Sequence, residues 1–397
     1  MKDLRIITTT VGIHFLSFSF LLPLLPDLAE TTGLSPLGIM LLESSFPFAH
    51  IVGILLLGHL RRVETLRWLI PLSLLLQGGG FGILAASFSQ SVGGAAVSGL
   101  FAARLVGGLA SAILPTALIW THRHVEPPAR LRAHASIFAT VTLGAGLGPF
   151  IAGWLGVTHL SAGSAVIAVV CILGCVWSAC RPLRASSNPT DSPPTNTQRA
   201  QERISKRLVA VFGGLMLLVG VSFAITRVTL PFFLHEVFAW KSLLIGLILT
   251  TLALLTFFTQ ISLTRTGTHL NAKRGTFASL GCLLFSFALI DTTSLLGLLL
   301  GLMFFGVGIG AIDPFLARLM TDRLPENTIT GSVSVIYALG ALSKFLAPPL
   351  AGLILQYKNS SAVFLTALFF TGLAALLLAR VRVIPRTDAQ KSNQTSP

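Results

Sequence analysis

The stretch Gly144-Ala-Gly-Leu-Gly-Pro-Phe-Ile-Ala-Gly153 places four glycines and one proline inside an apolar segment. Glycines remove side chains where helices touch in a membrane, and a proline bends the helix that contains it. Forty residues earlier, Arg104-Leu-Val-Gly-Gly108 places a positive charge inside another apolar segment. A charge at membrane depth is unfavourable, so it faces a partner or a polar cavity and marks a transport path. Together the two segments predict a membrane transporter rather than a passive helix bundle.

The composition excludes a soluble globular domain. Hydrophobic residues make up 53% and charged residues 11% of the 397 residues, whereas about 25% of the residues in soluble proteins are charged. Long apolar runs recur along the whole chain, as membrane-spanning helices require. We therefore expect an all-α membrane protein with twelve transmembrane helices, near residues 6–27, 36–58, 67–88, 93–120, 134–157, 162–180, 208–232, 243–263, 275–291, 295–320, 331–356 and 361–381.

The net charge of +14 raises the question of a nucleic-acid partner. The placement of the 28 Lys and Arg residues argues against one. Three lie in apolar runs (Arg104, Arg227, Lys344), two lie in loops predicted to be outside (Lys241, Lys358), and the rest lie in the termini and in alternate loops. This is the positive-inside pattern. It predicts an integral protein of a bacterial inner (cytoplasmic) membrane, with both termini in the cytoplasm and no nucleic-acid partner.

One polar segment divides the chain. Residues 181–207 are rich in Pro, Ser and basic residues, which is the composition of a disordered linker. We expect an N-terminal six-helix bundle at 1–180, this cytoplasmic linker, a C-terminal six-helix bundle at 208–383 and a disordered cytoplasmic tail at 384–397.

The two bundles repeat in sequence. Leu22-Pro23 precedes Gly38 by the same spacing as Leu230-Pro231 precedes Gly246. Four more positions match at one common offset, and these pairs are Gly107 and Gly306, Pro115 and Pro314, Pro149 and Pro348, and Gly153 and Gly352. A transporter made of two parallel repeats binds its substrate between them, near the middle of the membrane.

On these residues the chain resembles the major facilitator superfamily over nearly its whole length. Leu22-Pro-Leu-Leu-Pro26-Asp-Leu-Ala29 resembles the end of that family's first helix, and Arg104 to Gly108 resembles its helix-four arginine motif, which is associated with proton coupling. The segment 144–153 is similar to the helix-five motif of the twelve-helix drug:proton antiporter branch, with Ala152 in place of a glycine. The resemblance implies twelve helices, alternating access and exchange of a substrate against protons.

The loop after the second predicted helix departs from the family pattern. The family places an aspartate and an arginine there, followed by a second glycine. This chain reads Gly58-His-Leu-Arg-Arg62-Val-Glu64 instead, so Arg62 stands at the position of the gating aspartate. The details of gating are therefore not carried over from the family.

Two carboxylates lie in apolar runs, Glu43 in the second predicted helix and Asp313 before a proline in the tenth. An ionised carboxylate in hydrocarbon needs a partner or a proton, and the resemblance makes Arg104 the nearest partner for Glu43. We expect Glu43, Arg104 and Asp313 to couple transport to protons. The alternatives are a static ion pair for Glu43 and a capped helix kink for Asp313.

Arg227 and Lys344 add two cations at depth, which leaves three cations against two carboxylates. An anionic substrate, a neutral lysine or a further partner would balance this charge. We expect Arg227, Lys344, Ser19 and Gln77 to bind substrate, although Ser19 and Gln77 could instead join helices by hydrogen bonds. The residues expected at close-packed or hinge positions are Gly144, Gly148, Pro149, Gly153, Pro348 and Gly352.

These patterns predict a secondary active transporter that exports a small organic molecule against protons and acts as a monomer. No phosphate-binding motif, nucleophile–base group or cysteine ligand pattern is present in the sequence, so we expect no enzyme activity, no cofactor and no metal. One alternative is an importer or facilitator of an anionic metabolite or siderophore-like compound. Another is a receptor or assembly factor that uses the same fold without transport.

The linker yields a test of membrane orientation. Protease added to inside-out vesicles should cut within residues 181–207 and leave two membrane-held halves, because the polar composition of this segment predicts an exposed cytoplasmic chain. Immunoblots of the two ends would identify the fragments. Cleavage only from the opposite side of the membrane would reverse the predicted orientation.

Overall fold

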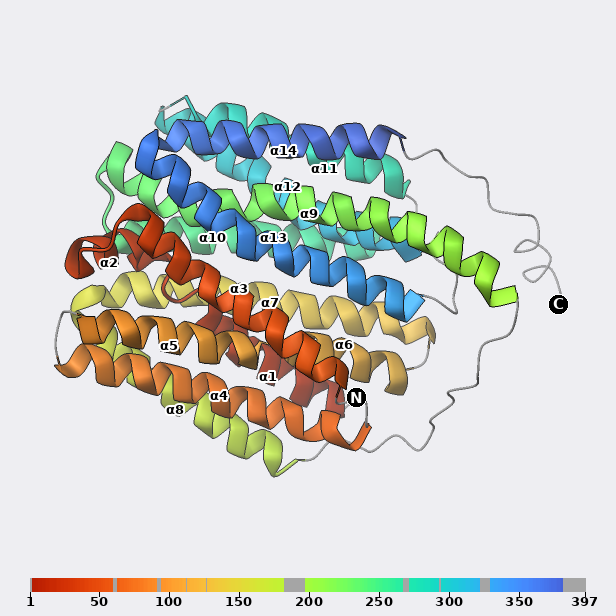
Figure 1. The fold of residues 1–397 in the computed structure, drawn as a ribbon, viewed down its shortest axis with the longest axis horizontal. Coiled ribbons are helices and arrows are strands. Elements are labelled where there is room, and N and C mark those ends of the chain that lie inside the picture. The colour runs from red at the N-terminus through yellow and green to blue at the C-terminus, as the bar shows by residue number, and fades with distance from the viewer. Residues whose placement is uncertain are drawn as a thin grey trace.

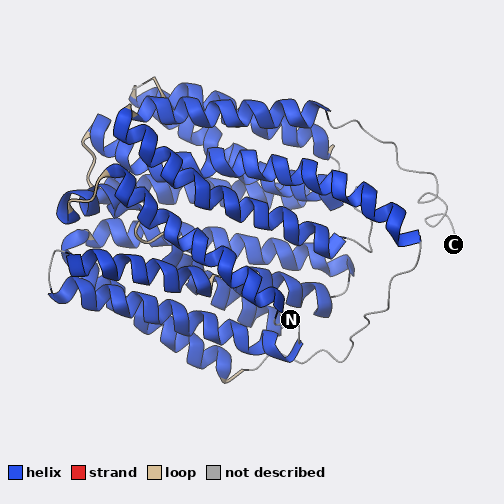
Figure 2. Cartoon of the chain, in the orientation of Figure 1, coloured by secondary structure: helices blue, strands red, loops and turns tan. Residues whose placement is uncertain are grey.

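The structure is a computed structural model that describes residues 2–59, 63–90, 94–111, 113–125, 127–181, 197–266, 271–292, 294–321 and 329–380. In these residues every regular element is helical (Figure 2). Most of the predicted linker, the predicted tail at 384–397 and Arg62 lie outside the described residues.

The elements of the first half are α1 (Lys2–Phe18), η1 (Leu22–Leu24), α2 (Leu25–Thr32), α3 (Pro36–His59), α4 (Val63–Gln90), α5 (Gly94–Ala110), α6 (Ile113–His124), α7 (Pro127–Leu155), η2 (Val157–His159) and α8 (Leu160–Ala179). Those of the second half are α9 (Thr197–Phe238), α10 (Ser242–Thr266), α11 (Ala272–Ile290), α12 (Leu295–Thr321), α13 (Ile329–Tyr357) and α14 (Ser360–Arg380). In the described residues, eleven segments are long and apolar enough to cross a membrane. The one remaining pass, which is the fourth along the chain, consists of the two shorter helices α5 and α6. The prediction of twelve transmembrane helices is therefore confirmed.

Two passes that were expected to be continuous are broken. The first pass ends α1 at Phe18 and resumes with η1 and α2, a region in which Pro23 and Pro26 cannot donate a backbone hydrogen bond. The fourth pass is interrupted between α5 and α6. Pro115 leaves the carbonyl of Ser111 without its usual helical donor, and Ser111 turns its own backbone N–H to the Gly108 carbonyl at 3.1 Å. Both breaks lie beside the residues that carry the candidate site.

The start of α9 differs from the expected boundary. Helix α9 begins at Thr197, so residues 197–207, which the composition assigns to the linker, are helical. The segment contains Gln, Arg, Ala, Glu and Lys, which favour helix by their intrinsic propensity. Residues 197–207 therefore form a polar helical extension that precedes the apolar part of α9, which begins at Leu208.

The two halves have the same internal packing, which confirms the repeat. In the first half α1 packs on α7, α4 on α5 and α8, and α3 on α5. In the second half the corresponding helices make the corresponding contacts, since α9 packs on α13, α11 on α12 and α14, and α10 on α12. The halves meet through α7 with α10 and through α13 with α3. The repeat relates these two contacts to each other, because α10 of the second half corresponds to α3 of the first, and α13 corresponds to α7.

Figure 1 shows the two halves stacked side by side, with α2 at one end of the bundle and the N-terminal end of α1 toward the other. At the end that carries α2, Glu30 Oε1 lies 3.3 Å from His235 Nε2 of α9. Further along the bundle, the Thr250 hydroxyl donates to the Gly146 carbonyl at 2.7 Å and the Ser44 hydroxyl donates to the Phe345 carbonyl at 2.9 Å. Contacts between the halves therefore start at the α2 end and reach the middle of the helices.

Gly148 gives a test of the close packing. A side chain at this position would collide with the backbone carbonyl oxygen of Leu16 in α1, and such overpacking destabilises proteins by about 1–3 kcal/mol. We expect Gly148→Leu to reach the membrane but to lose or uncouple transport and to unfold at a lower temperature. Fluorescence-detected size exclusion and flux measurements check both effects.

The matched control is Gly79→Leu in α4, because a side chain at Gly79 has no neighbouring atom within 4 Å. This control should keep the wild-type melting temperature and transport rate. Normal transport by Gly148→Leu would show that the close approach of α1 and α7 is not required.

Candidate functional site

A buried ion pair lies at the centre of the first half. Arg104 of α5 donates through Nη2 to Glu43 Oε2 of α3 at 2.5 Å, and the two side chains are only 7% and 6% exposed. The structure thus joins the two residues that the sequence analysis paired. A charge-assisted hydrogen bond of this kind is stronger than a neutral one, and it becomes stronger still where water is excluded.

The break in the first pass supplies a second partner for Arg104. Helix α1 ends at Phe18, and the last carbonyls of a helix have no donor within the helix. Arg104 Nη1 donates to the Phe18 carbonyl at 3.3 Å, and the guanidinium carbon lies 5.0 Å from the centre of the Phe46 ring. The Phe46 and Phe18 rings are in turn 4.8 Å apart. The guanidinium is therefore held by a carboxylate, a carbonyl and an aromatic face.

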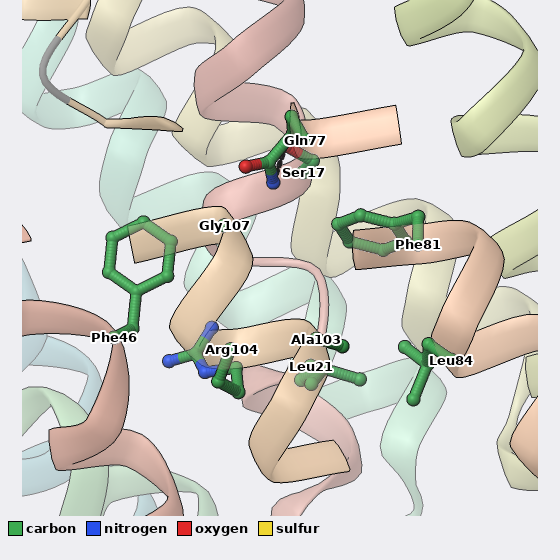
Figure 3. Close-up of a pocket in the computed structure, with 9 residues that line it drawn as sticks. All are labelled: Ser17, Leu21, Phe46, Gln77, Phe81, Leu84, Ala103, Arg104 and Gly107. Carbon is green, nitrogen blue, oxygen red and sulfur yellow. Dashed lines mark hydrogen bonds between the residues drawn. The ribbon is translucent and has the colours of Figure 1, made fainter. Parts of the chain in front are cut away.

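Polar atoms beside this pair remain without partners in the described residues. They are Glu43 Oε1, Arg104 Nε and Gln77 Oε1. A cavity of about 10 Å³ adjoins Arg104 and Gln77 and is lined by these two residues and Ser17 together with apolar side chains (Figure 3). This volume accommodates about one water molecule, and a polar lining is what a buried water requires.

Ser19 and Gln77 occupy positions inside the first half rather than between the halves. The Ser19 hydroxyl donates to the Ala145 carbonyl of α7 at 2.6 Å, and Gln77 Nε2 donates to the Ser17 hydroxyl at 2.5 Å. Both side chains are almost fully buried. They join helices of one bundle, which is the structural role that the sequence left open for them.

Arg227 reaches toward the first half from α9. Its guanidinium carbon lies 4.3 Å from the centre of the Phe18 ring. Its charge interacts with the charges of Glu43 and Arg104. The Phe18 ring therefore stands between the ion pair of one half and a cation of the other.

Asp313 of α12 and Lys344 of α13 form the second charged group of the site. Both are deeply surrounded by protein atoms, yet both side chains are exposed. A side chain with both properties lines a space inside the bundle rather than the outer surface. Their charges interact with each other, although the described residues contain no ion pair between them.

The residues expected at close-packed positions fall into two groups. Gly144 and Gly148 pack against the α1 backbone within the first half. Gly153 of α7 faces the carbonyl oxygen of Ser242 in α10, and Gly246 of α10 faces the carbonyl oxygen of Pro149 in α7. Gly352 packs on Leu37 and Met40 of α3, and Pro348 is buried in α13. Gly153 and Gly352, which occupy matching positions in the two repeats, thus both lie on the interface between the halves.

Phe18 and Phe46 are site residues that the sequence analysis did not select. Phenylalanine occurs 27 times in the chain, and no local pattern separates a ring that contacts an arginine from one that faces lipid. The only local signal is the position of Phe18 five residues before Pro23, in the region where the first helix has to break.

The ion pair gives a test that does not depend on the substrate. Removing one member of a buried pair strands the other charge and destabilises proteins by about 3–5 kcal/mol, whereas replacing both with apolar residues is often neutral. We expect Arg104→Leu to lower the melting temperature more than the double variant Glu43→Leu/Arg104→Leu. The exposed Lys358→Leu serves as the control. Additive losses in the double variant would show that the two side chains do not stabilise each other.

Comparisons with known proteins were made on the sequence and on the fold. The curated proteins contain no significant sequence match. Among solved structures, the human organic anion transporter MFSD10 (TETRAN) superposes with a TM-score of 0.67 at 20% identity, covering 94% of this chain and 98% of that one. An alanine mutant of the nucleoside transporter NupG superposes with a TM-score of 0.72 at 13% identity, covering 96% of this chain and 100% of that one.

These superpositions establish the shared fold. The sequence identities are too low to assign a substrate to this chain. A sequence profile matches at two overlapping ranges, residues 7–343 and 212–397, which together extend over nearly the whole chain. The chain is a multi-span transporter and belongs to the Major Facilitator Superfamily.

Proposed function

We propose that this protein exports a small organic molecule across the bacterial inner membrane in exchange for protons, as a monomer that works by alternating access. The observation that carries the proposal is the buried Glu43–Arg104 pair, whose second contact, Phe18, touches Arg227 of the other half. The charge on Glu43 is therefore connected to the boundary between the halves. The two structural neighbours are transporters of an organic anion and of a nucleoside, and both substrates are small organic molecules.

The coupling step follows from the chemistry of the pair. A proton that reaches Glu43 removes the negative charge and leaves Arg104 without its closest partner. A charge without a partner at membrane depth is unfavourable by about 2.5–3.5 kcal/mol or more. The halves then favour the arrangement in which this charge is best solvated or paired, and loss of the proton restores the original pair. Proton binding at Glu43 and substrate binding thus both shift the same equilibrium between the arrangements of the two halves.

The direction of transport rests on the glycine–proline segment. Gly144 to Gly153 resembles the antiporter motif, and in the structure Gly146 and Gly153 of this segment lie against α10. Rocking of one half on the other would act at this contact and at the matching contact of α13 with α3. The positive-inside pattern supports a cytoplasmic position for both termini.

Glu43→Gln tests the coupling step. We expect this variant to bind substrate but to lose proton coupling, because a neutral amide keeps the size of the carboxyl group and cannot exchange a proton. Arg104→Ala should abolish gradient-driven flux. Proteoliposomes on a solid-supported membrane, screened with a panel of metabolites, dyes and antibiotics, would identify a transported compound, after which flux and proton movement are measured together.

The control is Glu236→Gln, a carboxylate at the exposed end of α9, which should keep wild-type coupling. If Glu43→Gln keeps gradient-driven accumulation with wild-type pH dependence, Glu43 is not the coupling residue and Asp313 takes its place. Uptake into cells would indicate import, and absence of any flux would indicate a non-transporting role.

A further inference from the structure

The charges between the two halves do not balance. Of the three deep cations, Arg104 has Glu43 at 2.5 Å. Arg227 and Lys344 make no ion pair with any carboxylate in the described part of the chain. Asp313 offsets one of these two charges from a distance, so one positive charge is left over. Unbalanced charge inside a protein is expensive, and a bound ion of opposite sign removes this penalty.

We propose that the substrate is an organic monoanion with an aromatic or apolar body, and that Arg227 and Lys344 bind its negative group. This inference rests on the proposed transport function, whose site it specifies. Neither cation forms an ion pair with a carboxylate of the described residues, and like charges in one bundle repel each other unless an anion lies near them. They come from α9 and α13 of the same half, and Arg227 also touches the other half through Phe18.

The placement of Arg227 suits an anionic group. Its guanidinium lies over the Phe18 ring, 4.3 Å from the ring centre. A guanidinium held by its face on an aromatic ring keeps the N–H donors around its edge available. Those donors match the two oxygens of a carboxylate in a fork-like arrangement. Lys344 supplies a compact charge that is already exposed to the internal space.

Two aromatic pairs involve the helices that carry Glu43 and Lys344, and one of these pairs joins the two halves. Phe18 packs on Phe46 at 4.8 Å, and Phe48 of α3 packs on Phe345 of α13 at 5.6 Å. Phe345 follows Lys344 directly in the sequence, and the Phe48 side chain is 48% exposed. Binding sites for small molecules combine such apolar and aromatic walls with a few polar anchors. The apolar part of the substrate would therefore lie on these rings while its charge meets the cations.

The same charge pattern disfavours cationic substrates, because they would add to the one positive charge that is left over. It also fits the direction proposed above. A membrane potential that is negative inside favours the outward movement of an anion. The same potential also favours the inward movement of a proton. The membrane potential therefore drives both steps of an exchange in which the anion leaves and the proton enters.

Binding measurements on the full chain in nanodiscs, without any gradient, test the proposal. The probes are naphthoate, naphthamide and naphthylmethylammonium, which share one ring system and differ in charge, and octanoate as an anion without a ring. We expect naphthoate to bind at least about tenfold more tightly than naphthamide, because a hydrogen bond to a charged group is stronger than one to a neutral group. The ammonium probe should not bind. Octanoate should bind, but more weakly than naphthoate.

Variants assign the effect to the two cations. Arg227→Gln and Lys344→Gln should each weaken naphthoate binding about tenfold or more while leaving naphthamide unchanged. Lys358→Gln, which removes an exposed charge at the start of the loop before α14, should change neither. Arg227→Lys keeps the charge and controls for folding, and Arg227→Glu/Lys344→Glu should favour the ammonium probe instead.

The proposal is overturned if no carboxylate binds, if the amide or ammonium probe binds as well as naphthoate, or if the two Gln variants bind naphthoate normally. Binding requires no proton gradient, so it survives a failure of proton coupling in the Glu43→Gln experiment. Conversely, proton-coupled flux of neutral or cationic compounds alone would keep the transport function and reject the anionic substrate.

Discussion

A charge placed inside a bilayer has to meet an opposite charge or a polar group, and this constraint organises the first half of the protein. Arg104 satisfies it with Glu43 at 2.5 Å and with the Phe18 carbonyl at 3.3 Å. The second bond exists only because α1 ends at Phe18. The helix break, the aromatic rings and the ion pair are therefore one structural unit. Changing any part of it alters the surroundings of the others.

The contact between the halves follows a second constraint, which is close approach. Helices in lipid gain little from burying apolar side chains against each other and depend on tight packing instead. The paired positions Gly153 and Gly352 both lie on this interface, the first against α10 and the second against α3. Because the two contacts are related by the repeat, the same small-residue solution occurs twice. Such paired interfaces are what a rocking motion between two halves requires.

The two proposals meet at Phe18. On one side this residue accepts a hydrogen bond from Arg104 through its carbonyl, and on the other its ring contacts Arg227. A change of charge on Glu43 therefore changes the electric field at the cation proposed to bind the substrate. This connection gives proton exchange and anion binding a shared physical basis, without a long pathway between distant sites.

The sequence by itself determined the class of protein, the approximate spans, the repeat and the identity of the deep charges, because apolar length and charge placement are local properties that a bilayer makes decisive. It also singled out Glu43 and Arg104. Only the tertiary structure decided that Gln77 and Ser19 join helices within one bundle and that Phe18 and Phe46 belong to the site. It alone broke the first and fourth passes and carried α9 back to Thr197. The hydrogen bonds and ring contacts depend on which side chains from distant helices come together, and one span's sequence does not contain that information. The helix breaks and the start of α9 have local causes, which are prolines and helix-favouring residues, but only the structure shows where these causes prevail.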